Sequence, residues 1–294
     1  MEGKGPIVLL NVGDPCAAGE EFADRLRKRP YIYSMRIFLP LVLASCLIAA
    51  STQAQEHSSV SLSMGPALPV GQFANQDGES PSSGLARIGG LLDLSYQYRL
   101  GKGPFGLTGE LRARLNPMNE DAALTSLKAV DTGYAWTVAK KSWEAGAALA
   151  GAYYRSPLTG KFSLELALTV GCAEAVLPPF AASGIRNSPN YPGHQDYIVV
   201  SSNKVHALAP TGLFKAGVRY PLTPHFSLVA YMDFCYLKPT FRKVTENITT
   251  AEGLVVPNVY SLANGSVVYN DSNTADYTQH MNSVDAGIGL ALRL

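Results

Sequence analysis

The last 13 residues of the chain, residues 282–294, alternate between apolar and small or polar residues with a period of two. One parity holds Val284, Ala286, Ile288, Leu290, Leu292 and Leu294, and the other holds Ser283, Asp285, Gly287, Gly289, Ala291 and Arg293. Such a period is typical of a β-strand with one apolar face. Strands in soluble domains usually have about five or six residues, whereas roughly 9 to 11 tilted residues cross a bilayer. The length therefore favours a membrane-spanning strand.

Seven further segments are expected to form strands of similar length. They are residues 59–68, 86–99, 105–115, 143–155, 162–171, 212–220 and 226–236. On most of them the even-numbered apolar residues share one face, and on the third the odd-numbered residues do. The fourth is rich in Ala and Gly and has no clean parity, so we expect a bulge that lets both Trp143 and Tyr154 face outward.

A repeated turn motif divides the connections into two kinds. The pattern R-x-P-L-T-x-x-F-S-L begins at Arg155 and again at Arg219, and a looser copy begins at Arg99. Proline and glycine between alternating strands mark short turns, which we place on one rim. The other connections are long and comprise residues 69–84, 116–141, 175–204 and 242–279. An even strand number with short turns on one rim predicts an all-β fold, an eight-stranded antiparallel up-and-down transmembrane β-barrel.

Charged residues occupy the face opposite the apolar one, with both signs mixed. They are Arg87, Asp93, Arg99, Glu110, Arg112, Arg114, Glu165, Lys215, Arg219, Asp233, Asp285 and Arg293. A charge facing mid-bilayer lipid would cost roughly 2 to 4 kcal/mol, so we expect these side chains to form a paired charge network in the lumen. The alternative is a soluble lipocalin-like ligand-binding barrel whose apolar face points inward. Aromatic residues at the strand ends, which suit interfacial girdles, favour the membrane barrel.

The N-terminal region contains a secretory signal. Met35 and Arg36 precede an apolar run at residues 37–50, and small residues follow, so residues 35–54 are predicted to be a signal peptide cleaved after Ala54. The barrel domain then comprises residues 55–294. Residues 1–34 are either an upstream extension or the product of a mis-assigned start, and we favour translation from Met35. A lipobox-like sequence ending at Cys46 leaves lipidation of that cysteine as an alternative.

The composition excludes several classes of function. The formal net charge is +1, and no basic stripe indicates binding to nucleic acid. The four cysteines have neither zinc-site spacing nor enough members for a disulfide framework. No glycine-rich phosphate-binding motif opens a helix, so we expect no metal and no cofactor.

Catalysis at the outer rim of a barrel would need a histidine, a serine and an orienting carboxylate. Only His57 has a serine two residues away, Ser59, and it lies at the start of the mature chain. His206 and His280 lie near the outer ends of strands, without a serine at a fixed spacing. We therefore expect no catalytic residue, although a lipid-modifying enzyme of the lipid A acyl hydrolase type remains the alternative.

The signal peptide, the opening from Leu62 to Phe73 and the ending from Val284 to Leu294 resemble the eight-stranded outer-membrane β-barrel proteins of Bacteroidota, which are OmpX-like or OmpA-barrel-like. The resemblance implies integral residence in the outer membrane among its lipid and lipopolysaccharide. It also implies assistance from the barrel-assembly machinery and periplasmic chaperones. The chain departs from the pattern at Leu294, where many such proteins end in Phe or Tyr.

The function predicted on this basis is non-enzymatic, a structural or surface-interaction role through long extracellular loops. The longest loop, residues 242–279, carries Val and Tyr among Asn, Ser and Thr. It is either a disordered polar loop or a hairpin around Asn264 and Gly265, a favoured two-residue turn. A hairpin would extend the last two strands and offer an edge to a surface protein partner.

Overall fold

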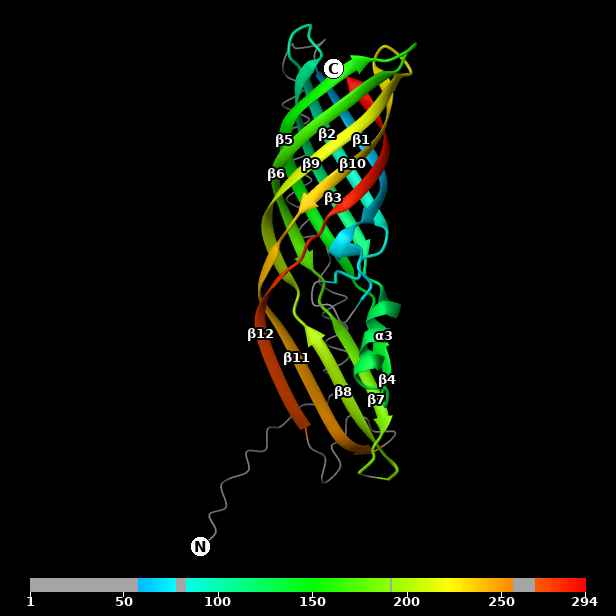
Figure 1. The fold of residues 1–294 in the computed structure, drawn as a ribbon, viewed down its shortest axis with the longest axis vertical. Helices are drawn as coiled ribbons and strands as arrows, with labels where there is room; N and C mark the ends of the chain where they lie inside the picture. The colour runs from blue at the N-terminus through cyan, green and yellow to red at the C-terminus, as the bar shows by residue number, and fades with distance from the viewer. Residues whose placement is uncertain (1–57, 78–82, 191, 256–267) are drawn as a thin grey trace.

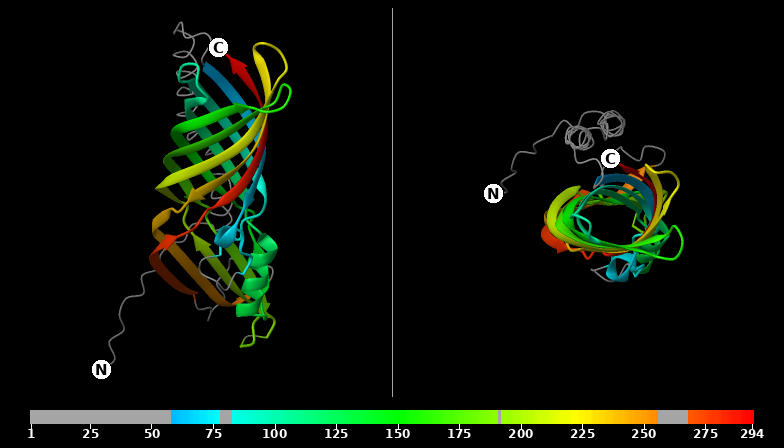
Figure 2. Two further views of the ribbon diagram at one scale, coloured as in Figure 1. Left: turned by 45° about the horizontal axis from the view of Figure 1, so that its top comes forward. Right: turned by 90° about the horizontal axis from the view of Figure 1, so that it is seen from above.

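Eight antiparallel strands close into a barrel, which confirms the predicted fold. The computed structural model describes residues 58–77, 83–190, 192–255 and 268–294. The strand order around the barrel is β1-β13-β10-β9-β6-β5-β3-β2, and Figure 2 shows these strands as a ring when viewed from above. Their bounds are β1 Ser58–Pro69, β2 Gly89–Arg99, β3 Phe105–Pro117, β5 Ser142–Pro157, β6 Ser163–Leu177, β9 Val205–Pro221, β10 Phe226–Leu237 and β13 Ser283–Arg293. The expected signal peptide, the upstream residues 1–34 and His57 lie outside the described residues.

A second sheet, here called the outer sheet, continues from one end of the barrel. Its strand order is β12-β11-β8-β7-β4, and Figure 1 shows it at the end away from the C-terminus. The bounds are β4 Ala135–Val138, β7 Ala181–Asn187, β8 His194–Ser202, β11 Thr240–Val255 and β12 Val268–Thr278. The 3-10 helix η1 (Gly71–Ala74) and the helix α3 (Glu120–Val130) lie in the first two long connections. The long connections therefore form much of a second region of structure that continues from one end of the barrel.

Each of the three short turns contains the same kind of hydrogen bond. All three lie on one rim of the barrel, which we call the turn rim. In each turn, the backbone N–H of a leucine donates to the carbonyl of a phenylalanine. The pairs are Leu100 to Phe105 (3.0 Å), Leu158 to Phe162 (2.8 Å) and Leu222 to Phe226 (2.9 Å). The sequence repeat therefore marks one structural corner, as predicted. The opposite rim, from which the outer sheet continues, is the sheet rim.

The outside of the barrel is apolar and the inside is largely charged. Leu168, Val170 and Met232 are 63%, 65% and 61% exposed on the wall. Asp93 and Asp285, of the opposite parity, are 1% and 0% exposed in the lumen. The predicted parity is confirmed on these strands, and the lipocalin-like alternative is wrong because it needs the apolar parity inside.

The expected bulge in the fourth barrel strand is wrong. β5 keeps an unbroken register with both β3 and β6. Trp143 is buried inside the lumen, where its indole N–H donates to the carbonyl of Gly84 at 2.8 Å, while Tyr154 belongs to the other parity. The lumen is apolar near the sheet rim, so it accommodates an indole without any change of register.

Of the two alternatives for the longest loop, the structure has the hairpin. β11 pairs antiparallel with β12, and the register shifts between Phe241 and Val244. Lys243 within this irregularity has a φ of 56°, and its backbone N–H donates to the Asp276 carboxylate at 3.0 Å. The Asn264–Gly265 turn lies outside the described residues. The connection at residues 175–204, for which no strand was predicted, contains a second hairpin, β7–β8.

Gly287 faces the lumen at a place where no larger residue fits. A Cβ there would lie 2.3 Å from Cζ of Tyr231, whose ring packs against Lys215 Nζ at 4.4 Å. We predict that Gly287→Ala lowers the free energy of unfolding by roughly 1–3 kcal/mol through overpacking. Gly90→Ala is the matched control, because a Cβ at Gly90 meets nothing within 4 Å. Urea unfolding in lipid vesicles measures both, and equal stability of the two variants would contradict this packing.

Candidate functional site

The middle of the lumen is organised around the guanidinium of Arg112 on β3. Its Nη1 donates to Asp233 Oδ1 at 2.9 Å and to Asp285 Oδ2 at 3.1 Å, and its Nη2 donates to Asp93 Oδ2 at 3.2 Å. Lys215 Nζ on β9 completes this group at 2.9 Å from Asp93 and 3.0 Å from Glu110. Because the five strands β2, β3, β9, β10 and β13 all contribute, the cluster ties opposite walls of the barrel together.

A second cluster lies nearer the turn rim. Arg155 Nη2 donates to Gln97 Oε1 at 2.5 Å and to Glu165 Oε2 at 2.8 Å. Arg219 Nη2 donates to the same Gln97 oxygen at 2.8 Å and lies 3.4 Å from Glu165 Oε2. The amide nitrogen of Gln97 donates to Glu165 in turn. Two arginines thus share one carboxylate and one amide, which satisfies most of the polar groups of this cluster.

The structure brings nine of the twelve charged residues named from the sequence into the lumen. These are Asp93, Glu110, Arg112, Arg114, Glu165, Lys215, Arg219, Asp233 and Asp285, all of which are buried. The other three, Arg87, Arg99 and Arg293, are exposed and are not buried in the network. They lie at or just beyond strand ends, where water solvates a guanidinium without a carboxylate partner. Arg99, for example, donates to the carbonyls of Gly103 and Lys102 in its own turn.

Sequence reasoning missed Arg155, Gln97 and Tyr231 in the lumen. Arg155 begins the first copy of the turn repeat, and Arg219, which begins the second copy, was assigned to the lumen. The repeat itself therefore carried the signal for Arg155. Gln97 and Tyr231 lie on the inward parity of β2 and β10, but they carry no charge and so were not selected.

The lumen near the sheet rim is filled by an apolar plug. We define the plug as Phe73, Trp143, Leu237, Phe241 and Met281, each of which is at most 4% exposed. The ring centroids of Phe73 and Trp143 are 5.7 Å apart, and those of Trp143 and Phe241 are 6.2 Å apart. η1 carries Phe73 into this position.

Arg114 connects the plug to the charge clusters, which lie farther from the sheet rim. Its guanidinium carbon lies 5.5 Å from the centre of the Phe73 ring. One terminal nitrogen donates to the Met281 carbonyl at 2.8 Å, and the other donates to the Ser283 hydroxyl. Ser283 in turn donates to Asp285 at 3.0 Å. Side chains therefore occupy the lumen at three successive levels.

The outer sheet has one protected edge and one open edge. β4 is four residues long, and Leu124 and Leu127 of α3 pack against a core that contains Trp136 of β4. At the other edge, β12 has 11 residues and pairs only with β11 among the described strands. The unprotected backbone of the outer sheet is therefore concentrated along β12.

Two polar groups of this region have perturbed pKa values. Burial raises the pKa of Tyr277 to about 12, so its phenol stays neutral and donates to Gln279 Oε1. Desolvation lowers the pKa of Arg186, but a hydrogen bond to Asp196 at 3.2 Å and the nearby Tyr134 and Asp131 raise it to a greater extent. Neither group is therefore poised to exchange a proton at neutral pH.

Among the histidines, His206 is paired with a carboxylate. His206 Nδ1 lies 2.8 Å from Glu174 Oε1 on the outside of the wall, and both side chains are about half exposed. In the described part of the chain, no group of three or more His, Cys, Asp and Glu side chains is arranged to hold a metal ion. Across the same residues, no helix has both the length and the apolar character needed to span a membrane.

The barrel is similar to solved structures at low sequence identity. Neisserial surface protein A (NspA) is 12% identical with a TM-score of 0.38, and 81% of this chain and 97% of that chain are covered. A major outer membrane protein from Thermus thermophilus is 12% identical with a TM-score of 0.41, over 81% and 99% of the two chains. Ail, the attachment invasion locus protein of Yersinia pestis, is 12% identical with a TM-score of 0.36, over 82% and 99%. No family model and no curated protein matches the sequence. These likenesses concern the fold alone.

We predict that Arg112→Met strongly destabilises the barrel. The substitution leaves Asp233 and Asp285 buried without the guanidinium that now lies within 3.1 Å of both, and breaking a buried ion pair costs roughly 3–5 kcal/mol. Adding Asp233→Asn should recover part of the loss, because it removes one of the uncompensated charges. Urea unfolding in vesicles measures the free energy of unfolding of the parent protein, of Arg112→Met and of the double variant. Arg99→Gln, at an exposed position, is the control. A cost for Arg112→Met no larger than that of Arg99→Gln would contradict the central role of this cluster.

We also predict that the barrel conducts little or no current. An eight-stranded barrel is just wide enough for side chains to fill, and here the plug and both charge clusters fill it. Planar bilayer recordings of the purified protein should show no large steps. Large and reproducible single-channel steps would contradict a filled lumen.

Proposed function

We propose that this chain is a non-enzymatic integral outer-membrane protein that presents its outer sheet at the cell surface to bind another protein. The observation that supports the membrane location is the uncharged belt around the barrel. On β9 every outward position from Leu208 to Tyr220 is uncharged. At roughly 3.3 Å per residue and a tilt of about 40° this segment rises roughly 30 Å, close to the thickness of the hydrocarbon core, about 30 Å.

Two aromatic pairs mark the boundary of this belt at the turn rim. The ring centroids of Phe105 and Tyr154 are 5.2 Å apart, and those of Phe162 and Tyr220 are 5.0 Å apart. Both pairs lie on the exposed side of the barrel next to the short turns. Aromatic side chains at this level are typical of the interfacial girdles of membrane barrels. With the predicted signal peptide, this arrangement favours a periplasmic turn rim and an extracellular sheet rim.

The open edge of β12 supports the binding role. An edge strand presents backbone N–H and C=O groups that another strand can pair with, and addition of a strand is a common mode of protein recognition. The opposite edge is short and packed against α3, so β12 is the edge that remains accessible. We infer that the partner is a surface protein that contributes an extended segment.

A lipid-modifying enzyme is the second candidate, and the His206–Glu174 pair is the observation in its favour. A histidine oriented by a carboxylate supplies two parts of a hydrolytic triad, and this pair lies on the outer wall. Within the described residues, no serine or threonine hydroxyl is hydrogen-bonded to His206. An altered pattern of lipid A acylation in cells that carry His206→Ala or His280→Ala would favour this candidate over the binding role.

Deletion of residues 253–276 tests the binding role. The barrel strands form no pairs with this segment, so we predict a folded barrel that still migrates anomalously on unheated gels. Cells that display the shortened protein should lose adhesion to cultured cells and to neighbouring cells. Unchanged adhesion would contradict a role for the outer hairpin.

A matched pair of substitutions tests the edge itself. Ser272 on β12 and Ser201 on β8 both pair with Asn247 of β11, so they share one face but only Ser272 lies at the edge. Ser272→Lys should abolish adhesion because an edge lysine opposes strand addition, whereas Ser201→Lys should leave it intact. Equal loss in both variants would indicate binding to the face of the sheet, which would contradict strand addition.

A further inference from the structure

A lateral opening, here called the notch, interrupts the barrel wall between β9 and the start of β11. The pairing of β10 with β9 ends at Leu237 and Thr211, after which the chain leaves the wall and begins β11 at Thr240. Residues 205–210 of β9 remain paired with β6 on their other side. The result is a cavity of about 370 Å³.

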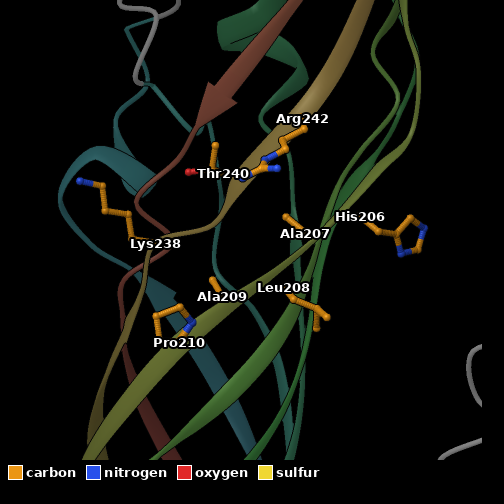
Figure 3. Close-up of a pocket in the computed structure, with 8 residues that line it drawn as sticks. All are labelled: His206, Ala207, Leu208, Ala209, Pro210, Lys238, Thr240 and Arg242. Carbon is orange, nitrogen blue, oxygen red and sulfur yellow. The ribbon is translucent and has the colours of Figure 1, made fainter.

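The notch has an apolar side and a polar side. Figure 3 shows β9 residues along one side, and along the other Lys238 of the β10–β11 connection with Thr240 and Arg242 at the start of β11. The lining residues are His206, Ala207, Leu208, Ala209, Pro210, Lys238, Thr240 and Arg242. Ala207 and Ala209 are buried and small, so their side chains leave the space inside the notch unfilled.

Two cations of the notch are available to a ligand. Lys238 and Arg242 are exposed, and no carboxylate of the described residues lies within 4.0 Å of either. The third basic residue, His206, is already engaged by Glu174 at 2.8 Å. The notch therefore carries a net positive charge from one ammonium and one guanidinium, a combination suited to phosphate.

The notch lies at the boundary of the uncharged belt nearest the sheet rim. Leu208, which is 80% exposed, is the last apolar outward residue of β9 before His206. On β10, Tyr236 is the last outward aromatic residue before Lys238. A backbone edge without a strand partner is costly in hydrocarbon but not among polar headgroups. These residues place the notch in the headgroup layer of the leaflet that surrounds the sheet rim.

We propose that the notch binds the anionic phosphate headgroup of a membrane lipid in preference to a zwitterionic headgroup such as phosphocholine. Lys238 and Arg242 contact the phosphate, and Leu208 and Pro210 contact the first part of the acyl chains, which continue along the belt. The continuity between the notch and the belt favours a lipid over a free anion, because a free anion would leave Leu208 uncovered. The inference rests on the proposed membrane location of the barrel.

The test uses the full mature chain in phosphatidylcholine nanodiscs that contain labelled phosphatidic acid. Native mass spectrometry measures how much phosphatidic acid stays bound to the protein. Lys238→Gln combined with Arg242→Gln should reduce the affinity roughly 25-fold, since each cation near an anionic surface contributes about fivefold. The control is Lys128→Gln combined with Lys140→Gln, which removes the same charge from positions outside the notch and should bind like the parent protein.

The outcomes separate this inference from the proposed function. Failure of the parent protein to insert into phosphatidylcholine bilayers would contradict the membrane location itself. Normal insertion with no preference for phosphatidic acid, or equal losses in both double variants, would overturn the notch alone. Glycerol phosphate and inorganic phosphate serve as competitors without acyl chains. Competition by either at the concentration of the lipid would assign the notch to a free phosphate and overturn the lipid assignment.

Discussion

The contact of the Arg112 guanidinium with three aspartates is the interaction on which the barrel depends. A closed sheet that is apolar outside must place its other parity in the lumen, and a charged lumen is tolerable only if the charges compensate one another. The acids Asp93, Glu110, Glu165, Asp233 and Asp285 face an equal number of bases, Arg112, Arg114, Arg155, Lys215 and Arg219. Because these pairs join strands far apart around the ring, the same contacts that neutralise the lumen also fix which walls lie opposite each other.

Parity made the barrel predictable where the two faces differ in chemistry. On β13 and β3 the outward residues are apolar and the inward ones are small or charged, so the sequence indicates both the strand and its orientation. On β5 the contrast disappears because alanine and glycine occupy both faces and the lumen near the sheet rim is itself apolar. Trp143 and Phe73 are as apolar as any lipid-facing residue, so their hydrophobicity alone does not indicate that they face the lumen.

The outer sheet was predictable only in part, for a related reason. Strict alternation is absent from β7 and β8, which mix polar and apolar residues along their length. The signal for α3 was present in a different form. Asn119 caps the helix by accepting from the N–H groups of Asp121 and Ala122, and the acidic Glu120 and Asp121 occupy its first turn. An Asn followed by two acids is a helix-start pattern, which a search for alternating residues does not detect.

The notch and the open edge of β12 follow from one change of pairing. When β10 ends at Leu237, its continuation β11 no longer pairs with β9 and pairs instead with β8, across residues 194–202. That exchange leaves residues 205–210 of β9 without a partner on one side, and it makes β12 the last strand of a sheet that does not close. A barrel that continued its closed pairing beyond the membrane would have neither feature. The departure of β11 from β9 at the sheet rim is therefore the single structural step that produces both the notch and the open edge, the two features on which the proposed lipid and strand binding rest.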